Sequence, residues 1–322
     1  MNRTSLRNAV IAFTAFAGAL VGSGAAAWAE GRAVPWQMGF QDPATPVMER
    51  IISFHNLLLV IIGVIVIFVM GLLLYVIIRF RASRNPVPSK TTHNTLIEVM
   101  WTAVPIMILV VIAVPSFRLL YFSDQVPEKK AREAGAPVMT IKATGHQWYW
   151  VYEYAKVDKA GTNLRFESRI ACRGAKDKDT GRTDCQDFEK ENGYKPLRLL
   201  DVDNRIVVPV GAYVRLQVTA ADVLHSWAVP AFGVKLDGAP GRLNETWFRA
   251  TKTGVFYGMC SELCGVDHGY MPIAVEVVSK EKYEAWVVRA LKNDDYEKIK
   301  AAAPTMTQTT IARAGKPTKT ND

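Results

Sequence analysis

Two long apolar stretches near the start of the chain constrain its fold more than any other feature. Leu57 to Ile78 contains no charged residue, and neither does Met100 to Phe117. A helix needs about 20 apolar residues to cross roughly 30 Å of hydrocarbon, so each stretch can span a bilayer. Pro105 and Pro115 favour packing of the second stretch against another protein, since neighbouring groups must satisfy the freed carbonyls. The sequence predicts a two-helix transmembrane hairpin over residues 54–122, and a hairpin alone in lipid is the alternative.

The loop between the stretches predicts the orientation of the hairpin. Residues 79–99 contain four basic residues and one acid, Glu98, whereas residues 30–53 are not enriched in bases. The positive-inside rule places this loop in the cytoplasm. The exported N-terminal segment, residues 30–53, and everything after Tyr121 are then expected to face outward.

Residues 1–29 have the pattern of a cleavable signal peptide. Two arginines precede an apolar run from Ala9 to Val21, and small residues lead to Ala27-x-Ala29. The run is too short to span the bilayer comfortably, which favours cleavage over a retained anchor. The net charge of +9 says little about partners, and no nucleic-acid-binding motif accompanies the basic residues.

Residues 123–279 have the pattern of an all-β domain. Short β-type runs separated by Gly, Pro and Asp suggest a sandwich or barrel. The predicted strands are Val138–Ala143, Gln147–Tyr154, Arg205–Val210, Tyr213–Thr219, Thr246–Ala250, Val255–Tyr257 and Ile273–Val278. Residues 156–195 are interpreted as a charged surface insertion. Residues 280–303 have helical spacing and should pack on the sandwich, before a disordered tail over residues 304–322.

The four cysteines form two unlike pairs. Cys172 and Cys185 flank a charged segment, and in an oxidising exterior they predict a disulfide, with a metal role as the alternative. Cys260 and Cys264 share one loop with His268 and Met271, at intervals of three or four residues. Two thiols, an imidazole and a thioether form a soft-metal ligand set rather than a hard-cation site.

Copper fits this loop best, because thiolate, thioether and imidazole all suit it and His225 supplies a second imidazole. Zinc is the first competitor, but Met271 counts against it since a thioether is a poor zinc ligand. A mononuclear blue-copper site needs one cysteine, so two thiolates that bridge two copper ions use every available group. A local disulfide between Cys260 and Cys264 is the remaining alternative.

Together with three further motifs, this loop resembles subunit II of the bacterial haem–copper cytochrome c oxidases. The motifs are Gly145-His-Gln-Trp-Tyr-Trp150, Asp222-Val-Leu-His-Ser-Trp-Ala-Val-Pro230 and Pro240-Gly-Arg-Leu-Asn244, and the similarity covers most of residues 45–295. The resemblance implies a cupredoxin-like sandwich on a two-helix hairpin, holding the dinuclear centre called copper A. The implied ligands are His225, Cys260, the backbone carbonyl of Glu262, Cys264, His268 and Met271.

The resemblance also implies where the electron enters the chain. Trp148 would receive it from cytochrome c, although core packing is the alternative for an anonymous tryptophan. Asp222 would help to dock the lysine-rich face of cytochrome c, or else be a solvated turn acid. Neighbouring acids expected to help are Glu153, Asp201 and Asp203.

Two glutamates have roles that come from the resemblance. The side chain of Glu262 would bind a Mg²⁺ or Mn²⁺ ion shared with subunit I, and an exposed acid is the alternative. Glu98 would belong to a proton-uptake pathway. It also follows Thr95 at capping-box spacing, so it is expected to start a helix as well.

The expected function is electron transfer in a proton-pumping oxidase of the bacterial inner membrane, with the N-terminus and copper domain in the periplasm. Ferrocytochrome c would reduce copper A, which passes electrons to haem in subunit I for the reduction of oxygen. Subunit III and membrane lipid would be further partners. A copper-free structural subunit II of a quinol oxidase is the alternative, and the intact cysteine pair speaks against it. The length of 322 residues excludes the large catalytic domain of a nitrous-oxide-reducing enzyme.

Overall fold

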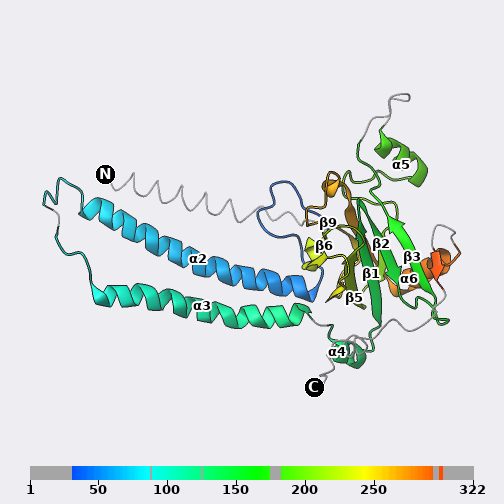
Figure 1. Cartoon of the computed structure of the whole chain (residues 1–322), viewed down its shortest axis with the longest axis horizontal. Coiled ribbons are helices and arrows are strands. Elements are labelled where there is room, and N and C mark those ends of the chain that lie inside the picture. The colour runs from blue at the N-terminus through cyan, green and yellow to red at the C-terminus, as the bar shows by residue number, and fades with distance from the viewer. Residues whose placement is uncertain (1–30, 88, 125, 175–182, 293–296, 300–322) are drawn as a thin grey trace, which may run out of the picture.

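The computed structural model describes residues 31–87, 89–124, 126–174, 183–292 and 297–299. The predicted signal peptide, residues 1–29, and the predicted disordered tail, residues 304–322, lie outside these ranges. Within them, a pair of long helices projects from one side of a β-sandwich (Figure 1). The predicted fold class, a two-helix hairpin with an all-β domain, is confirmed.

The hairpin consists of α2 (Pro46–Arg79) and α3 (Thr95–Asp124), which lie side by side (Figure 1). Both are long and apolar enough to cross a membrane, and the side chains of their most apolar segments are not buried within the described structure. Thr45 begins α2, because its hydroxyl accepts the Met48 N–H at 3.1 Å and the next residue is a proline. A proline suits the first helical position, where no N–H partner is required.

Helix α3 is capped by Asn94 rather than by Thr95, which corrects the predicted capping box by one residue. The Asn94 side chain accepts the N–H groups of Leu96 and Ile97 at 3.1 and 3.2 Å. The Glu98 carboxylate accepts the Asn94 N–H at 3.1 Å in return. Asparagine is a stronger N-cap than threonine, which explains the shift.

The sandwich is bonded to the N-terminal end of α2 and to the C-terminal end of α3. The Thr45 hydroxyl donates to the Phe232 carbonyl at 2.6 Å, in the short helix η1 (Pro230–Phe232). The Trp247 indole donates to the carbonyl of Phe122 near the end of α3 at 3.0 Å, and the Arg50 guanidinium lies 3.4 Å from the Phe122 ring centroid. Contacts from two separate helices therefore hold the β-domain against the hairpin.

The described residues form two sheets that face each other across one core. The 6-stranded sheet has the order β11-β3-β2-β1-β5-β8, and the 5-stranded sheet has the order β4-β10-β9-β6-β7. The first sheet comprises β1 (Val138–His146), β2 (Tyr149–Tyr154), β3 (Asn163–Ser168), β5 (Tyr213–Ala220), β8 (Asn244–Phe248) and β11 (Glu297–Ile299). The second comprises β4 (Ile206–Pro209), β6 (His225–Val229), β7 (Val234–Gly238), β9 (Gly254–Cys260) and β10 (Pro272–Val278).

Alternation along the strands produces the core. In β5, Val214, Leu216 and Val218 are buried, while Arg215 and Gln217 between them are partly exposed. This period of two is expected of a sheet with one face on the core. Strand β5 pairs in parallel with β1, and β4 pairs in parallel with β10.

Strand β3 lies inside the segment that the sequence predicted to be a surface insertion, so that prediction is wrong for residues 163–168. Leu164 and Phe166 point into the core and are buried. Arg165 and Glu167 occupy the other face. These charged residues made the segment look like a surface loop in the sequence, although buried and more exposed residues alternate along it. Strands β6, β7 and β11 were also missing from the predicted set.

The C-terminal helix α6 (Lys280–Ala290) is shorter than the predicted residues 280–303. Tyr283 and Trp286 pack against the core, as expected of a helix on the sandwich. Further along, β11 pairs with β3 instead of continuing the helix. Asparagine and aspartate follow Lys292 in the sequence, and these residue types compete with the helical backbone for hydrogen bonds.

Candidate metal centre

Three connections meet at one end of the sandwich. They are the turn between β1 and β2, the connection from β5 to β6, and residues 261–271 between β9 and β10, called here the ligand loop. Strands β9 and β10 pair with Met259 opposite Pro272, and Trp227 of β6 lies opposite Cys260. Because paired strands precede and follow the ligand loop, the sheet sets the distance between the two ends of the loop.

Cys260 at the end of β9 and Cys264 in the ligand loop are reduced and buried, with exposed fractions of 4% and 3%. Their sulfur atoms are 3.9 Å apart, which rules out a disulfide bond between them in this conformation. Within the described residues, His225, Cys260 and Cys264 form a group whose ligand atoms lie within 4.8 Å of one another. The predicted metal-binding pair therefore comes together as free thiols.

Each thiol has its own imidazole and its own weaker donor. Cys260 Sγ lies 3.8 Å from His225 Nδ1 and 3.3 Å from the Glu262 carbonyl oxygen. Cys264 Sγ lies 3.5 Å from His268 Nδ1 and 3.5 Å from Met271 Sδ. The structure thus brings all the predicted ligand groups together as two half-sites that share a pair of sulfurs.

This donor set fits two soft metal ions better than one. A single tetrahedral ion would leave the thioether and the carbonyl without a role. Two ions bridged by the thiolates would each receive one imidazole and one weak donor. The thioether of buried Met271 favours copper over zinc, as the sequence predicted.

The two thiols ionise unequally in the metal-free chain. Burial opposes ionisation of Cys260, but contacts with the His225 imidazole and with backbone N–H groups outweigh it and lower the pKa of this thiol. Burial, followed by the neighbouring Cys260 thiolate, raises the pKa of Cys264. One proton therefore leaves more easily than the other.

Asp222 orients the His225 ring. Its Oδ1 atom lies 2.9 Å from His225 Nε2, so Nδ1 of the same ring faces Cys260. Its Oδ2 atom accepts the Gln147 N–H at 2.7 Å, which ties the β1–β2 turn to the ligand. Partial burial would raise the pKa of Asp222, yet the hydrogen bonds from His225, Val223 and Gln147 lower it. The sequence suggested docking or a solvated turn acid for Asp222, although its spacing of three residues from His225 was a usable signal.

Gly145 makes room for the same ring. A Cβ atom at this position would lie 2.7 Å from the His225 ring, closer than real contacts allow. Strand β1 can therefore approach β6 only because this residue has no side chain.

Trp148 touches the ligand loop directly. Its indole N–H donates to the Cys264 carbonyl at 3.2 Å, and the Gln147 side chain donates to the same oxygen at 2.8 Å. A Cβ atom on Gly265 would meet the Trp148 ring at 3.0 Å, so the ring lies against the loop backbone. Trp148 is half-buried, whereas Trp150 is fully buried. Gln147 had no predicted role, and nothing in its local sequence indicates this contact.

The acids predicted to dock a partner differ in their surroundings. Glu153 forms an ion pair with Lys142 at 3.0 Å. Asp203 is exposed and accepts the Arg169 N–H. The prediction for Asp201 is wrong, because this side chain is 2% exposed and paired with Arg205 at 2.8 Å. A buried carboxylate with its own arginine cannot contact a partner protein.

Two predicted glutamates lie in different parts of the molecule. The residue Glu262 is exposed, while its carbonyl faces Cys260. Glu98 lies at the start of α3, far along the hairpin from the sandwich (Figure 1). Their proposed metal and proton roles stay predictions.

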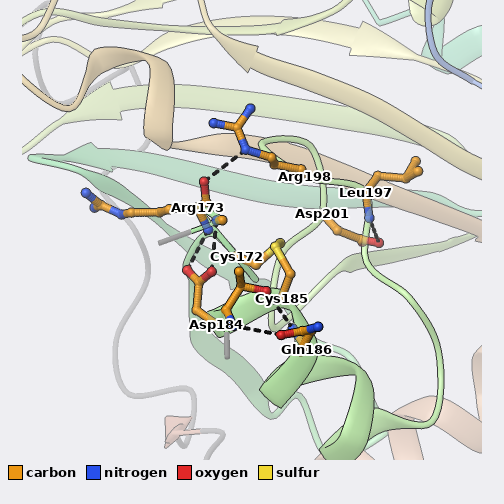
Figure 2. The surroundings of a disulfide bond; sticks show 10 residues. Cys172, Arg173, Asp184, Cys185, Gln186, Leu197, Arg198 and Asp201 are labelled. Atoms are coloured by element: carbon orange, nitrogen blue, oxygen red, sulfur yellow. Dashed lines mark hydrogen bonds between the residues drawn. A yellow bond between two sulfur atoms is a disulfide. The ribbon is translucent and has the colours of Figure 1, made fainter. Parts of the chain in front are cut away.

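The second cysteine pair forms a disulfide between Cys172 and Cys185 (Figure 2). It joins the segment after β3 to helix α5 (Asp184–Asn192), as the sequence predicted. Thr183 and Gln186 form a reciprocal capping box that begins this helix.

Comparison with known proteins gives consistent matches over both parts of the chain. Residues 33–119 match the family model described as cytochrome c oxidase subunit II, transmembrane domain, and residues 139–278 match its periplasmic domain. A "probable cytochrome c oxidase subunit 2" of Rickettsia felis is 51% identical over 256 residues, covering 79% of this chain and 72% of the relative. The cytochrome c oxidase subunit 2 of Phytophthora megasperma is 45% identical over 263 residues, covering 81% and 90%.

A solved structure also matches the β-domain. It is the crystal structure of the periplasmic domain of subunit II of cytochrome oxidase (CoxB) of Bradyrhizobium japonicum, which is 50% identical to this chain. The match covers 48% of this chain and 94% of that one, with a TM-score of 0.38.

Proposed function

The chain belongs to the cytochrome c oxidase subunit II family, and from that premise we propose that it is the subunit through which a respiratory oxidase takes up electrons. It is a membrane protein and a part of an oxidoreductase complex. The observation that carries the proposal is the pair of free thiols 3.9 Å apart, each with its own imidazole and weak donor. We assign this site to a dinuclear copper centre of the copper A type.

Bound there, two copper ions would supply a centre that gains and loses one electron. The protein's part is to hold the donors still. Cys260 belongs to β9, His225 begins β6, and Met271 directly precedes β10, so paired strands fix three of the donors. Rigid ligands keep the rearrangement on each electron transfer small, which favours speed.

Trp148 is the residue that we propose receives the electron from cytochrome c. It is half-buried, so part of the ring is accessible to a partner. Its indole N–H is bonded to the Cys264 carbonyl, which would give a short path to the sulfur of that residue. Asp222, with Glu153 and Asp203 in support, would attract the lysine-rich surface of cytochrome c, and such steering weakens as salt rises.

The wider assignments follow the same family membership. Residues 1–29 would be removed as a signal peptide, residues 79–99 would face the cytoplasm, and the β-domain would lie in the periplasm of a bacterial inner membrane. Subunit I would hold the haem that receives the electron and reduces oxygen to water, coupled to proton pumping, with subunit III alongside. Glu262 would share a Mg²⁺ or Mn²⁺ ion with subunit I. Glu98 would take up protons for the oxidase.

Rapid mixing with ferrocytochrome c tests the role of Trp148. The copper-loaded full chain in detergent should be reduced quickly, and Trp148→Phe should be reduced much more slowly at unchanged copper content. The matched control is Trp286→Phe on α6, which changes the same residue type away from the ligand loop. Equal rates for Trp148→Phe and the unaltered chain would show that the electron enters elsewhere.

A further inference from the structure

Arg173 lies beside the disulfide between Cys172 and Cys185 (Figure 2). This arginine directly follows Cys172. The Asp184 carboxylate accepts the N–H groups of Arg173 and Gly174 at 2.7 and 2.8 Å. The Arg198 side chain donates to the Arg173 carbonyl at 3.0 Å. Both the N–H and the carbonyl of Arg173 are therefore hydrogen-bonded, and the preceding residue, Cys172, is covalently linked to α5.

The Arg173 side chain leaves this segment and reaches the ligand loop. Its Nη1 atom lies 3.0 Å from Asp267 Oδ2, across a separation of 94 positions in the sequence. Its guanidinium carbon lies 4.9 Å from the ring centroid of Tyr270. Asp267 directly precedes His268, and Tyr270 directly precedes Met271. One side chain thus holds both ends of the stretch that supplies two donors to the Cys264 half-site.

This stretch has little stiffness of its own. Gly265 adopts a φ of +119°, a conformation that side chains rarely allow, and a Cβ atom on Gly269 would meet nothing within 4 Å. Its internal hydrogen bonds are short-range, from His268 N–H to Gly265 and from Tyr270 N–H to Asp267. The first half of the ligand loop is held differently, because the Ser261 N–H donates to the carbonyl of Ser226 in β6. The Met271 carbonyl is held by the sandwich, because it accepts the Cys260 N–H and the Trp150 indole N–H. Contacts from a distant segment should therefore matter most for the residues before it in the stretch 265–271.

We propose that Arg173 is a positioning residue for His268 and for the turn that leads to Met271, and that the disulfide is what makes its position rigid. The inference rests on the proposed function, since it assigns these two side chains to the metal centre. An ion pair and a cation–π contact from one guanidinium restrain the backbone beside each donor. Without them, the Cys264 half-site should open more often and release metal faster.

Hydrogen exchange of the metal-free full chain in detergent tests the restraint without any copper. Arg173→Gln should speed amide exchange in residues 265–271 by about twofold to tenfold, the range expected for a partly exposed ion pair plus a cation–π contact. Exchange in β5 should stay unchanged. Lys190→Gln is the matched control, because it makes the same charge change on the exposed surface of α5. Arg173→Lys keeps the charge and should recover part of the protection.

Copper release into a chelator and electron paramagnetic resonance give the second readout. Arg173→Gln should lose copper about twofold to tenfold faster and show a changed hyperfine pattern, with Lys190→Gln like the unaltered chain. In the hydrogen-exchange experiment, a chain with Cys172→Ser and Cys185→Ser should also exchange the amides of residues 265–271 faster, although Arg173 is intact. If only Arg173→Gln shifts them, the disulfide is not part of the restraint.

The two proposals fail in different ways. If the unaltered chain binds two coppers, and Arg173→Gln matches it in exchange, release and spectrum, the positioning role is overturned and the proposed function stands. If the unaltered chain binds no copper, the proposed function fails, and the exchange comparison still decides whether Arg173 restrains the loop.

Discussion

His225 shows how residues outside the ligand set shape the centre. Its Nδ1 atom faces Cys260 while Nε2 is bonded to Asp222, so the carboxylate fixes which nitrogen is free for a metal. Partners of this kind orient the ring and increase its basicity. Asp222 therefore has two roles in this account, one toward the metal and one toward cytochrome c.

Removal of the Asp222 carboxylate should weaken the metal site. Asp222→Ala frees the His225 ring and should lower copper affinity about 10-fold to 100-fold, the usual cost of losing such a partner. Competition with a chelator measures this affinity. Glu153→Ala is the control, since it removes another predicted docking acid in an ion pair on β2. If both variants keep full affinity, Asp222 serves docking alone.

Copper uptake should depend on pH through the cysteine pair. The pKa of Cys264 is raised by burial and by the neighbouring thiolate, so this thiol carries its proton at neutral pH and must lose it to bind metal. Affinity should therefore rise with pH, by about tenfold per unit for each proton released. Titration of copper in weak buffer, with the released acid recorded, checks both the sign and the number. Uptake without proton release would contradict the thiolate assignment.

Single residues were predictable from the sequence where chemistry and spacing coincide. The recurrence of Cys260, Cys264, His268 and Met271 along one loop identified a soft-metal site, and the location of the other two cysteines indicated their disulfide. Contacts between distant segments were not predictable. Gln147 meets Asp222 across 75 positions.

Among the secondary-structure elements, β1 and β6 approach each other at the metal centre. Gly145 of β1 lies against the ring of His225 at the start of β6. The short β-type runs predicted β1, β2, β5 and β10 well, because the apolar residues of each strand are buried. Strands β6 and β7 are short and contain polar or charged residues, so their sequence pattern is weak. They are defined by pairing, since β6 pairs with both β7 and β9.

Gly145→Ala should disturb both the fold and the metal centre. The added methyl group would lie 2.7 Å from the His225 ring, and overpacking of this kind lowers the free energy of unfolding by about 1–3 kcal/mol. Chemical denaturation of the full chain measures the change. Gly269→Ala provides the comparison, because a Cβ atom there meets nothing within 4 Å. Equal stability of the two variants would mean that β1 can move away from β6 freely.

For the whole molecule, the hairpin and the β-domain form one connected structure. Thr45 and Trp247 bond across the junction, so the metal centre has a defined position relative to the membrane helices. The sequence predicted both parts from hydropathy and strand pattern. It could not predict the junction, because Phe122 and Trp247 are 125 positions apart and neither belongs to a motif.

We propose that His225, Cys260 and the ligand loop hold two copper ions that share one unpaired electron. Metal analysis combined with electron paramagnetic resonance of the purified full-length chain tests it most directly. We expect two coppers per chain with a mixed-valence signal, and loss of that signal in Cys260→Ser. Bound zinc, or a single copper with the spectrum of a mononuclear site, would contradict it.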